Sequence, residues 1–149
     1  MLSPVLIGVV LLAEEGTSTA TAATSGRLAQ HLSNDRLIAV GFVCYGIGFL
    51  ATWFVSASLA VAGALIIVGA GIGLLLPTVD TAVSERVPAE YRAGAFSLRN
   101  STTFTGRATG PVTFAGLAGT EFVGYGGLLL AAAVVAFGAA LVALLSESQ

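Results

Sequence analysis

Five apolar stretches, each long enough to cross a lipid bilayer, fill most of this 149-residue chain. Crossing the hydrocarbon core takes about 20 helical residues, and helices are favoured there because lipid offers no partner to free backbone groups. Charged residues make up only 9% of the chain, against about 25% in soluble domains. The sequence therefore predicts an all-α membrane protein, one domain over residues 1–149, with five transmembrane helices near residues 4–25, 37–55, 59–83, 92–118 and 125–145.

The positions of the arginines predict how these helices are oriented. Basic residues in short loops are retained on the cytoplasmic side of a membrane. Arg27 and Arg36 mark the first loop and Arg86 and Arg92 the third, whereas the second and fourth loops contain no basic residue. We therefore expect a multi-pass protein of the plasma membrane, with its N-terminus outside and its C-terminus in the cytoplasm.

Composition and motifs argue against several other classes of function. The net charge is −2 and the six basic residues are all arginine, so no basic surface for nucleic acid is expected. His31, the single histidine, has no neighbouring residues at metal-ligand spacing. The sequence contains neither a nucleotide-binding loop nor a nucleophile elbow. We expect no metal, no cofactor and no enzymatic activity.

Two adjacent glutamates, Glu14 and Glu15, lie in the middle of the first apolar stretch. At 1.5 Å per residue from Gly26 they are roughly 16–18 Å above the inner boundary, near the midplane. A charge there costs about 2.5–3.5 kcal/mol on insertion scales, so it normally faces the protein interior or a water-filled cavity, where it can exchange a proton. Adjacent helical residues point about 100° apart, so one glutamate is expected to face the cavity more directly. Alternatively, the first helix is misplaced and the pair ends a short outer segment.

The fourth apolar stretch carries a polar face. Its residues recur at helical spacing; they are Asn100, Thr103, Arg107 and Gly110. Arg107 lies about 22 Å from Arg92, within roughly one turn of the glutamates in depth, and is the expected counter-charge. We expect Glu14, Glu15, Asn100, Thr103 and Arg107 to line a proton and substrate pathway.

Glycines and prolines suggest helix packing and bends. Glycines four apart let another helix approach closely, and a proline inside a helix removes a backbone donor and bends it. The residues concerned are Gly69, Gly73, Pro77, Gly106, Gly110 and Pro111. Asp80 lies one turn beyond Pro77, near the inner end of its helix, where it is expected to form a latch with Arg86 or Arg99. Arg99 can alternatively extend toward the headgroups.

The segment from Gly26 to Arg36, GRLAQHLSNDR, resembles the G-x-L-A-D-R-x-G-R-R loop of the major facilitator superfamily. Gly26, Leu28, Ala29 and Arg36 match this pattern, with Arg27 beside them. The aspartate of the family pattern is Gln30 here and its second glycine is Ser33. In that family the glycine lets a helix end pack closely and the charges latch neighbouring helices.

A second set of segments looks like helices ten and eleven of drug-exporting members of that family. They are 71–77, 87–92 and 106–111. The resemblance covers nearly the whole chain and implies a partial major-facilitator C-terminal bundle, helices eight to twelve of a twelve-helix fold. The missing N-terminal helices, or a separately encoded half, would then supply the opposite wall of the cavity.

The same resemblance implies a proton-coupled exporter of small molecules that works by alternating access. Glu14 or Glu15 would be the proton site, Arg107 would tune it, and Pro111 would bend its helix around the cavity. Arg107 stands where the compared members carry an uncharged amide, which admits anionic or zwitterionic substrates. A different class of function stays open, a non-transporting membrane scaffold or subunit that binds partner helices.

Overall fold

The computed structural model describes residues 4–54, 58–119 and 124–147. These residues form five long helices and one short 3-10 helix, with no strand among them. In chain order they are α1 (Pro4–Leu28), α2 (Asn34–Phe54), α3 (Ser58–Arg86), η1 (Ala89–Tyr91), α4 (Arg92–Ala118) and α5 (Gly124–Glu147). The predicted all-α fold with five long helices is confirmed. Val55, the predicted end of the second helix, and both chain termini lie outside the described residues.

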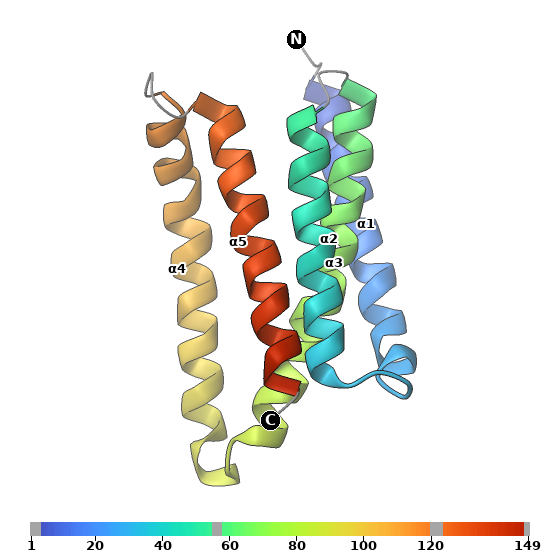
Figure 1. Ribbon diagram of the computed structural model, residues 1–149, viewed down its shortest axis with the longest axis vertical. Helices are drawn as coiled ribbons and strands as arrows, with labels where there is room; N and C mark the ends of the chain where they lie inside the picture. The colour runs from blue at the N-terminus through green and yellow to red at the C-terminus, as the bar shows by residue number, and fades with distance from the viewer. Residues whose placement is uncertain (1–3, 55–57, 120–123, 148–149) are drawn as a thin grey trace.

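The helices run side by side, but their order in space differs from their order in sequence (Figure 1). α3 packs along both α1 and α2, and α2 packs along both α3 and α5. α4 touches α5 and α3 only sparsely, at the opposite edge of the molecule from α1. The α1–α2 and α3–α4 connections and the end of α5 lie at one end of the bundle (Figure 1), which we call the inner end because the arginines of the sequence predict that it faces the cytoplasm.

Four of the helices, α1, α2, α3 and α5, are long and apolar enough to cross a membrane. α4 has 27 residues but a less apolar composition, because it carries three arginines, an asparagine and five threonines. Its hydroxyl groups bond within the helix, as when Thr102 donates to the carbonyl of Leu98 at 2.9 Å. Such bonds satisfy a hydroxyl group without a neighbouring helix. The span predicted near residues 92–118, the fourth in the chain, is thus a long helix of a different character from the other four.

The first connection is shorter than the sequence suggested. α1 continues to Leu28, so Gly26 and Arg27 belong to its last turn rather than to a loop. α2 is capped by Ser33, whose Oγ accepts a hydrogen bond from the backbone N–H of Arg36 at 3.3 Å. A serine at this position satisfies one of the free N–H groups that begin a helix. This cap moves the start of α2 three residues ahead of the predicted one, and Arg36 into its first turn.

α3 also runs further inward than predicted, to Arg86. It ends there because Val87 precedes Pro88, and the residue before a proline disfavours the helical conformation. Pro77 lies inside α3 without ending it. A proline within a spanning helix is tolerated where neighbouring helices or hydroxyl groups cover the freed backbone.

Small residues let α2, α3 and α5 approach one another closely. The ring of Phe137 on α5 lies against Gly46 of α2, and Leu75 of α3 lies against Gly41 of α2. In both places a Cβ atom would come within 2.6 Å of the neighbouring side chain. Alanines complete these contacts; those buried on α5 are Ala133, Ala136 and Ala140. Packing through small side chains is the usual way that helices associate in lipid.

Candidate functional site

The structure turns the two central glutamates in different directions. Glu14 is half-buried and Glu15 is exposed. The side chain of Glu14 begins over Gly69 of α3, with its Cγ 3.1 Å from the place that a Cβ at Gly69 would take. Glu14 stands about 21 Å from the inner end of α1, in the middle third of the helix. Of the two carboxyl groups, Glu14 therefore faces the interior more directly.

Gly69 and Gly73 form the closest contact between α1 and α3. A Cβ at Gly69 would collide with the backbone carbonyl of Glu14, and one at Gly73 would collide with the carbonyl of Ser18. A Cβ at Gly73 would also lie 2.9 Å from the Cβ of Thr21. Because most of these obstacles are backbone atoms, the two helices can cross at this distance only with glycine at both positions.

Hydroxyl groups extend from Glu14 toward the inner end along the same face of α1. They belong to Ser18, Thr21 and Ser25, at helical spacing, and both serines are buried. Ser25 lines a small cleft of about 50 Å³ that also includes Gly26, Pro77 and Thr78. This cleft shares Ala29, Asn34 and Thr81 with a wider one of about 420 Å³ at the inner end. A polar stripe therefore leads from Glu14 to the inner surface.

The polar residues of α4 lie apart from the glutamates. Asn100 and Arg107 are exposed, and Thr103 and Gly110 are half-buried. Among the residues that the structure describes, no ion pair joins Arg107 to Glu14 or Glu15. Nothing lies within 4 Å of a Cβ built at Gly106 or Gly110. The glycine pair of α4, unlike that of α3, has no helix packed against it in the described part of the chain.

Tyr45 of α2 lies between these two regions. It is half-buried, its ring lies 3.2 Å from where a Cβ at Gly71 of α3 would be, and it borders a cleft together with Thr103 of α4. It therefore links the interior of the bundle with the polar face of α4. Pattern reasoning had not singled out Tyr45.

Asp80 and Arg99 connect α3 to α4 in the inner half of the bundle. Nη2 of Arg99 lies 3.3 Å from Oδ1 of Asp80, and it also donates to the carbonyl of Leu76 at 3.4 Å. Oδ1 of Asp80 is buried and has no hydrogen-bond partner among the described residues. The contact is therefore an ion pair by proximity, without the alignment of a hydrogen bond. Arg99 also donates to Asn100, at 3.1 Å.

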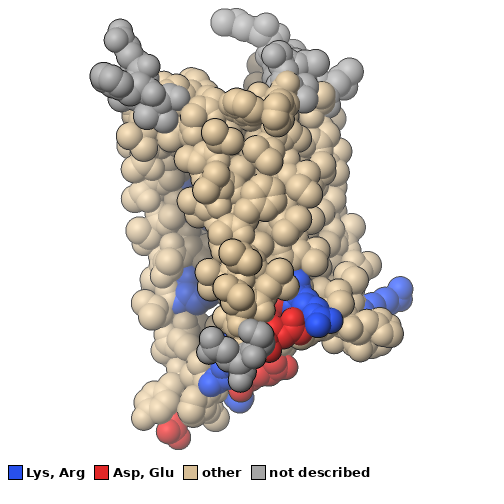
Figure 2. Space-filling view, viewed as in Figure 1, with Lys and Arg blue, Asp and Glu red and all other residues tan. Residues whose placement is uncertain are grey.

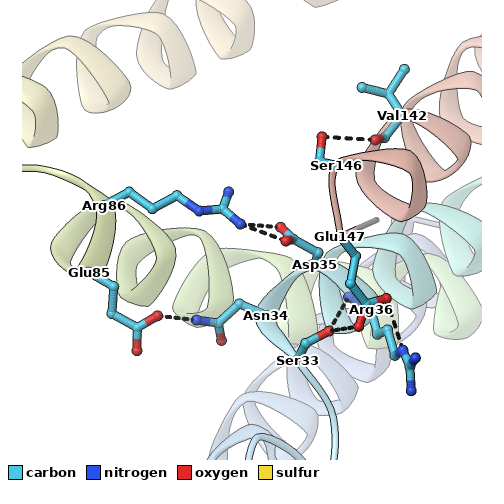
Figure 3. A network of polar contacts seen from close by, with 9 residues as sticks. All are labelled: Ser33, Asn34, Asp35, Arg36, Glu85, Arg86, Val142, Ser146 and Glu147. Carbon is cyan, nitrogen blue, oxygen red and sulfur yellow. Dashed lines mark hydrogen bonds and ion pairs between the residues drawn. The ribbon is translucent and has the colours of Figure 1, made fainter. Parts of the chain in front are cut away.

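Arg86, the other partner expected for Asp80, binds Asp35 instead. Its Nη2 donates to both carboxylate oxygens of Asp35, each at 2.6 Å (Figure 3). Asn34 beside it donates to Glu85 at 2.7 Å. These bonds fasten the start of α2 to the end of α3. Arg86 cannot also pair with Asp80, because its guanidinium is bonded to Asp35, about one and a half helical turns closer to the inner end than Asp80.

A second cluster fastens α2 to the end of α5. Nε of Arg36 donates to Glu147 at 2.9 Å, and the hydroxyl of Ser33 donates to the same carboxylate at 2.8 Å (Figure 3). Figure 2 shows most of the visible charged side chains gathered near this inner end, below a surface of uncharged residues. Of the residues that resemble the family loop, Arg36 takes part in the cluster. Gly26, Arg27 and Leu28 lie one connection away, in the last turn of α1.

An open cleft separates α2 and α3 from α4. It measures about 370 Å³ and is lined by Phe42, Tyr45, Leu75, Leu76, Val79, Arg99, Thr102 and Thr103. An apolar cleft of about 320 Å³, lined in part by Phe49 and by α5, shares Phe42, Tyr45 and Leu75 with it. The two hollows thus meet at the aromatic side chains of α2.

Comparison with known families identifies the class of protein. The sequence profile of the Major Facilitator Superfamily matches residues 1–148. The chain belongs to this superfamily. No curated protein and no solved structure matches it.

Membership of the Major Facilitator Superfamily fits the spanning helices described above. The chain is a multi-pass membrane protein, and the superfamily is one of secondary transporters for small molecules. The predicted resemblance to the superfamily is therefore confirmed. Within the described ranges, no group of three metal-ligating side chains gathers anywhere.

The sequence patterns considered above did not single out the aromatic residues of α2. Phe42, Tyr45 and Phe49 occupy one face of α2, with ring centroids 6.5 Å apart for the first pair and 5.9 Å for the second. A signal was available in the sequence, since aromatic residues at i, i+3 and i+7 share a helix face. It was hidden because the surrounding residues are also apolar.

Proposed function

We propose that this chain is the C-terminal part, helices eight to twelve, of a proton-coupled exporter of the multidrug type. In this proposal it lies in the plasma membrane with its inner end in the cytoplasm. A cavity between two halves opens alternately to each side, as in other secondary transporters. The observation that carries the proposal is Glu14, half-buried where α1 crosses Gly69 of α3.

Glu14 suits a proton site because its charged form is costly at this depth. None of the described ion pairs involves it. Uptake of a proton would remove that cost, and release would restore it. Since Glu14 sits at a contact without spare room, a change in its charge can favour a different position of α1 relative to α3.

The polar stripe of α1 supports a route for protons to Glu14. Ser18, Thr21 and Ser25 carry hydroxyl groups from Glu14 toward the cleft at the inner end. The hydroxyl of Ser25 donates to its own helix, at 2.7 Å from the carbonyl of Ala22, which leaves its lone pairs free to accept a bond from water. Water in that cleft would connect the stripe with the cytoplasm.

α4 supplies the other side of the proposed pathway, with Asn100, Thr103 and Arg107 along it. The open glycines Gly106 and Gly110 and the neighbouring Pro111 give this helix room to bend. Helices of the other half, encoded upstream or by a separate gene, would close the cavity. The pair Asp80–Arg99 would act as an inner latch that holds α4 against α3 in one orientation.

Reconstitution in proteoliposomes tests this function. The chain is inserted alone and together with its encoded N-terminal half, and a proton gradient is imposed in the presence of ethidium or naphthoate. Gradient-driven accumulation should be lost in Glu14→Gln and reduced less in Glu15→Gln. Glu90→Gln removes an exposed carboxylate at the inner end and serves as the matched control. Gradient-driven transport that survives Glu14→Gln and Glu15→Gln together would disprove the proton site.

A non-transporting scaffold is the second candidate, and the open face of α4 favours it. Among the described residues no helix lies against Gly106 and Gly110, and small residues at this spacing suit a partner helix. A scaffold would retain its partner in co-purification when Glu14 is replaced by glutamine, and would lose it in Gly106→Leu. It would show no gradient-driven uptake, whether the chain is inserted alone or together with its N-terminal half.

A further inference from the structure

We infer that the cleft between α2, α3 and α4 binds an organic anion with an aromatic body. The inference rests on the proposed transport function and names its class of substrate. The cleft combines three elements that such a molecule needs, an aromatic wall, a polar edge and an unpaired positive charge. Each is supplied by described side chains.

The aromatic wall consists of Phe42, Tyr45 and Phe49. Neighbouring rings are tilted by 41° in both pairs, so their faces and edges are both presented along the helix. Phe42 and Tyr45 border the cleft of about 370 Å³, and all three residues border the adjoining one of about 320 Å³. Small-molecule sites typically occupy about 300–1,000 Å³ and are lined mainly by apolar and aromatic groups. A flat ring system can therefore lie against α2 and reach into both hollows.

The polar edge lies on α4. Thr103 borders the cleft, and Arg107 stands one helical turn beyond it on the same face. Thr103 already donates its hydroxyl proton to the carbonyl of Arg99 at 3.0 Å, so its oxygen is left to interact with a ligand donor or water. A polar group of the ligand would therefore point toward α4 while its rings face α2.

The two arginines near the cleft differ in how far their charge is already neutralised. Arg99 is engaged by Asp80, by Asn100 and by the carbonyl of Leu76. For Arg107 the described residues provide no ion pair, and it lies one helical turn from Thr103, which lines the cleft. The free charge beside the cleft is therefore positive, and it favours an anionic group near Arg107.

The depth of Arg107 argues for a substrate rather than a lipid headgroup. Arg107 lies about 22 Å along α4 from Arg92 and about 16 Å from Ala118 at its other end. Headgroup phosphates lie outside a hydrocarbon core of about 30 Å. An anion at Arg107 must therefore enter the protein at mid-depth, as a transported molecule does.

Binding to the purified chain in lipid nanodiscs tests the inference. The probes are naphthoate, neutral naphthamide and cationic naphthylmethylamine, measured by equilibrium dialysis. We expect naphthoate to bind most tightly, and Arg107→Gln to raise its Kd by about tenfold or more. Arg107→Lys should recover much of the loss, and naphthamide should be insensitive to either change. Phe42→Leu should weaken naphthoate and naphthamide alike.

Matched controls lie elsewhere on α4. Arg92→Gln removes an arginine at the inner end, and Phe104→Leu removes an aromatic ring that is 67% exposed and outside the cleft. Both should leave naphthoate binding unchanged. Preferential binding of naphthylmethylamine, or naphthoate binding that ignores both Arg107→Gln and Phe42→Leu, would overturn the inference. If Arg107→Gln does not fold, the ranking of the three probes on the unaltered chain still decides the matter.

The inference and the proposed function fail in different ways. Glu14→Gln should keep naphthoate binding while it loses gradient-driven uptake. Naphthoate binding that depends on Arg107, without any proton-driven transport by the reconstituted protein, would leave the site standing and refute the exporter. Proton-driven transport of ethidium without naphthoate binding would leave the exporter standing and refute the site.

Discussion

Two glycine pairs with the same spacing have opposite surroundings in this protein. Gly69 and Gly73 of α3 lie against the backbone of α1 so closely that neither could carry a Cβ atom. In the described part of the chain, nothing lies within 4 Å of the same position at Gly106 and Gly110 of α4. The spacing of small residues thus permits close approach of another helix but does not specify which helix comes, or whether one does.

The two regions also differ in how far their polar residues are buried. The contact of α1 with α3 buries Ser18 and Ser25 and half-buries Glu14. α4 instead leaves Asn100 and Arg107 exposed and touches its neighbours sparsely. α1, α2, α3 and α5 therefore form a packed group, and α4 is the helix whose position other contacts can set.

Adding one methyl group to each glycine pair should produce the largest difference in the free energy of unfolding. Gly73→Ala forces a Cβ against the carbonyl of Ser18, and overpacking of this kind costs about 1–3 kcal/mol. Gly106→Ala meets nothing and should stabilise the helix by up to about 1 kcal/mol, since alanine is the better helix former. Unfolding in mixed micelles, followed by circular dichroism, measures both. Equal effects of the two substitutions would show that α4 is as tightly packed as α3.

The packed group was largely predictable from the sequence, because its causes are local. Long apolar runs specify the helices, and the glycines of α3 announce a close contact. The ends were less predictable, since the cap at Ser33 and the last turn of α1 depend on single hydrogen bonds. The sequence could not show that Arg86 binds Asp35 rather than Asp80, because that choice depends on how far α3 runs inward.

Removing the ion pair between α3 and α4 should have the next largest effect. Asp80→Asn leaves the guanidinium of Arg99, whose side chain is 20% exposed, without its carboxylate. Because the carboxyl side chain is itself 44% exposed, we expect a loss of about 1–2 kcal/mol rather than the full cost of an unpaired charge in lipid. The loss should appear as movement of α4 rather than as unfolding.

Spin labels at Leu98 of α4 and Val40 of α2, both exposed, can report that movement in a Cys44→Ala background. Asp80→Asn should broaden the distribution of distances between them. Exchanging the charges, Asp80→Arg with Arg99→Asp, should narrow it again. A distribution that stays narrow in Asp80→Asn would mean that apolar contacts alone hold α4.

The candidate site was less predictable than the fold, for a physical reason. Glu14 and Arg107 attract attention because charges are rare in lipid-facing sequences, but the sequence could not show that Tyr45 borders a cleft with Thr103, one turn from Arg107. Phe42, Tyr45 and Phe49 lie among other apolar residues, so only the positions of α3, α4 and α5 reveal that they border clefts.

Ser33→Ala should have a smaller effect, confined to the packed group. It removes the cap of α2 and the bond to Glu147 at 2.8 Å, and the loss of a helix cap costs about 1 kcal/mol. Ser33→Thr keeps the hydroxyl and should recover most of that loss. The free energy of unfolding in mixed micelles measures both variants. Broadening of the distances to α4 in Ser33→Ala would contradict the separation of the two regions.

The bidentate pair at the inner end should show the smallest effect, although its distances are shorter than those of the other two ion pairs described. The side chain of Arg86 is 59% exposed and that of Asp35 is 13% exposed, so water offsets most of the attraction, and we expect a coupling of about 0.5–1 kcal/mol. A double-mutant cycle of Asp35→Asn and Arg86→Gln measures it, and added salt should reduce it. Arg92 bonds the carbonyl of Val87, so the same cycle with Arg92→Gln should give no coupling. A larger coupling that is insensitive to salt would show that this pair is less hydrated than its exposure indicates. The inner end, rather than the glycine contact between α1 and α3, would then be the main support of the packed group.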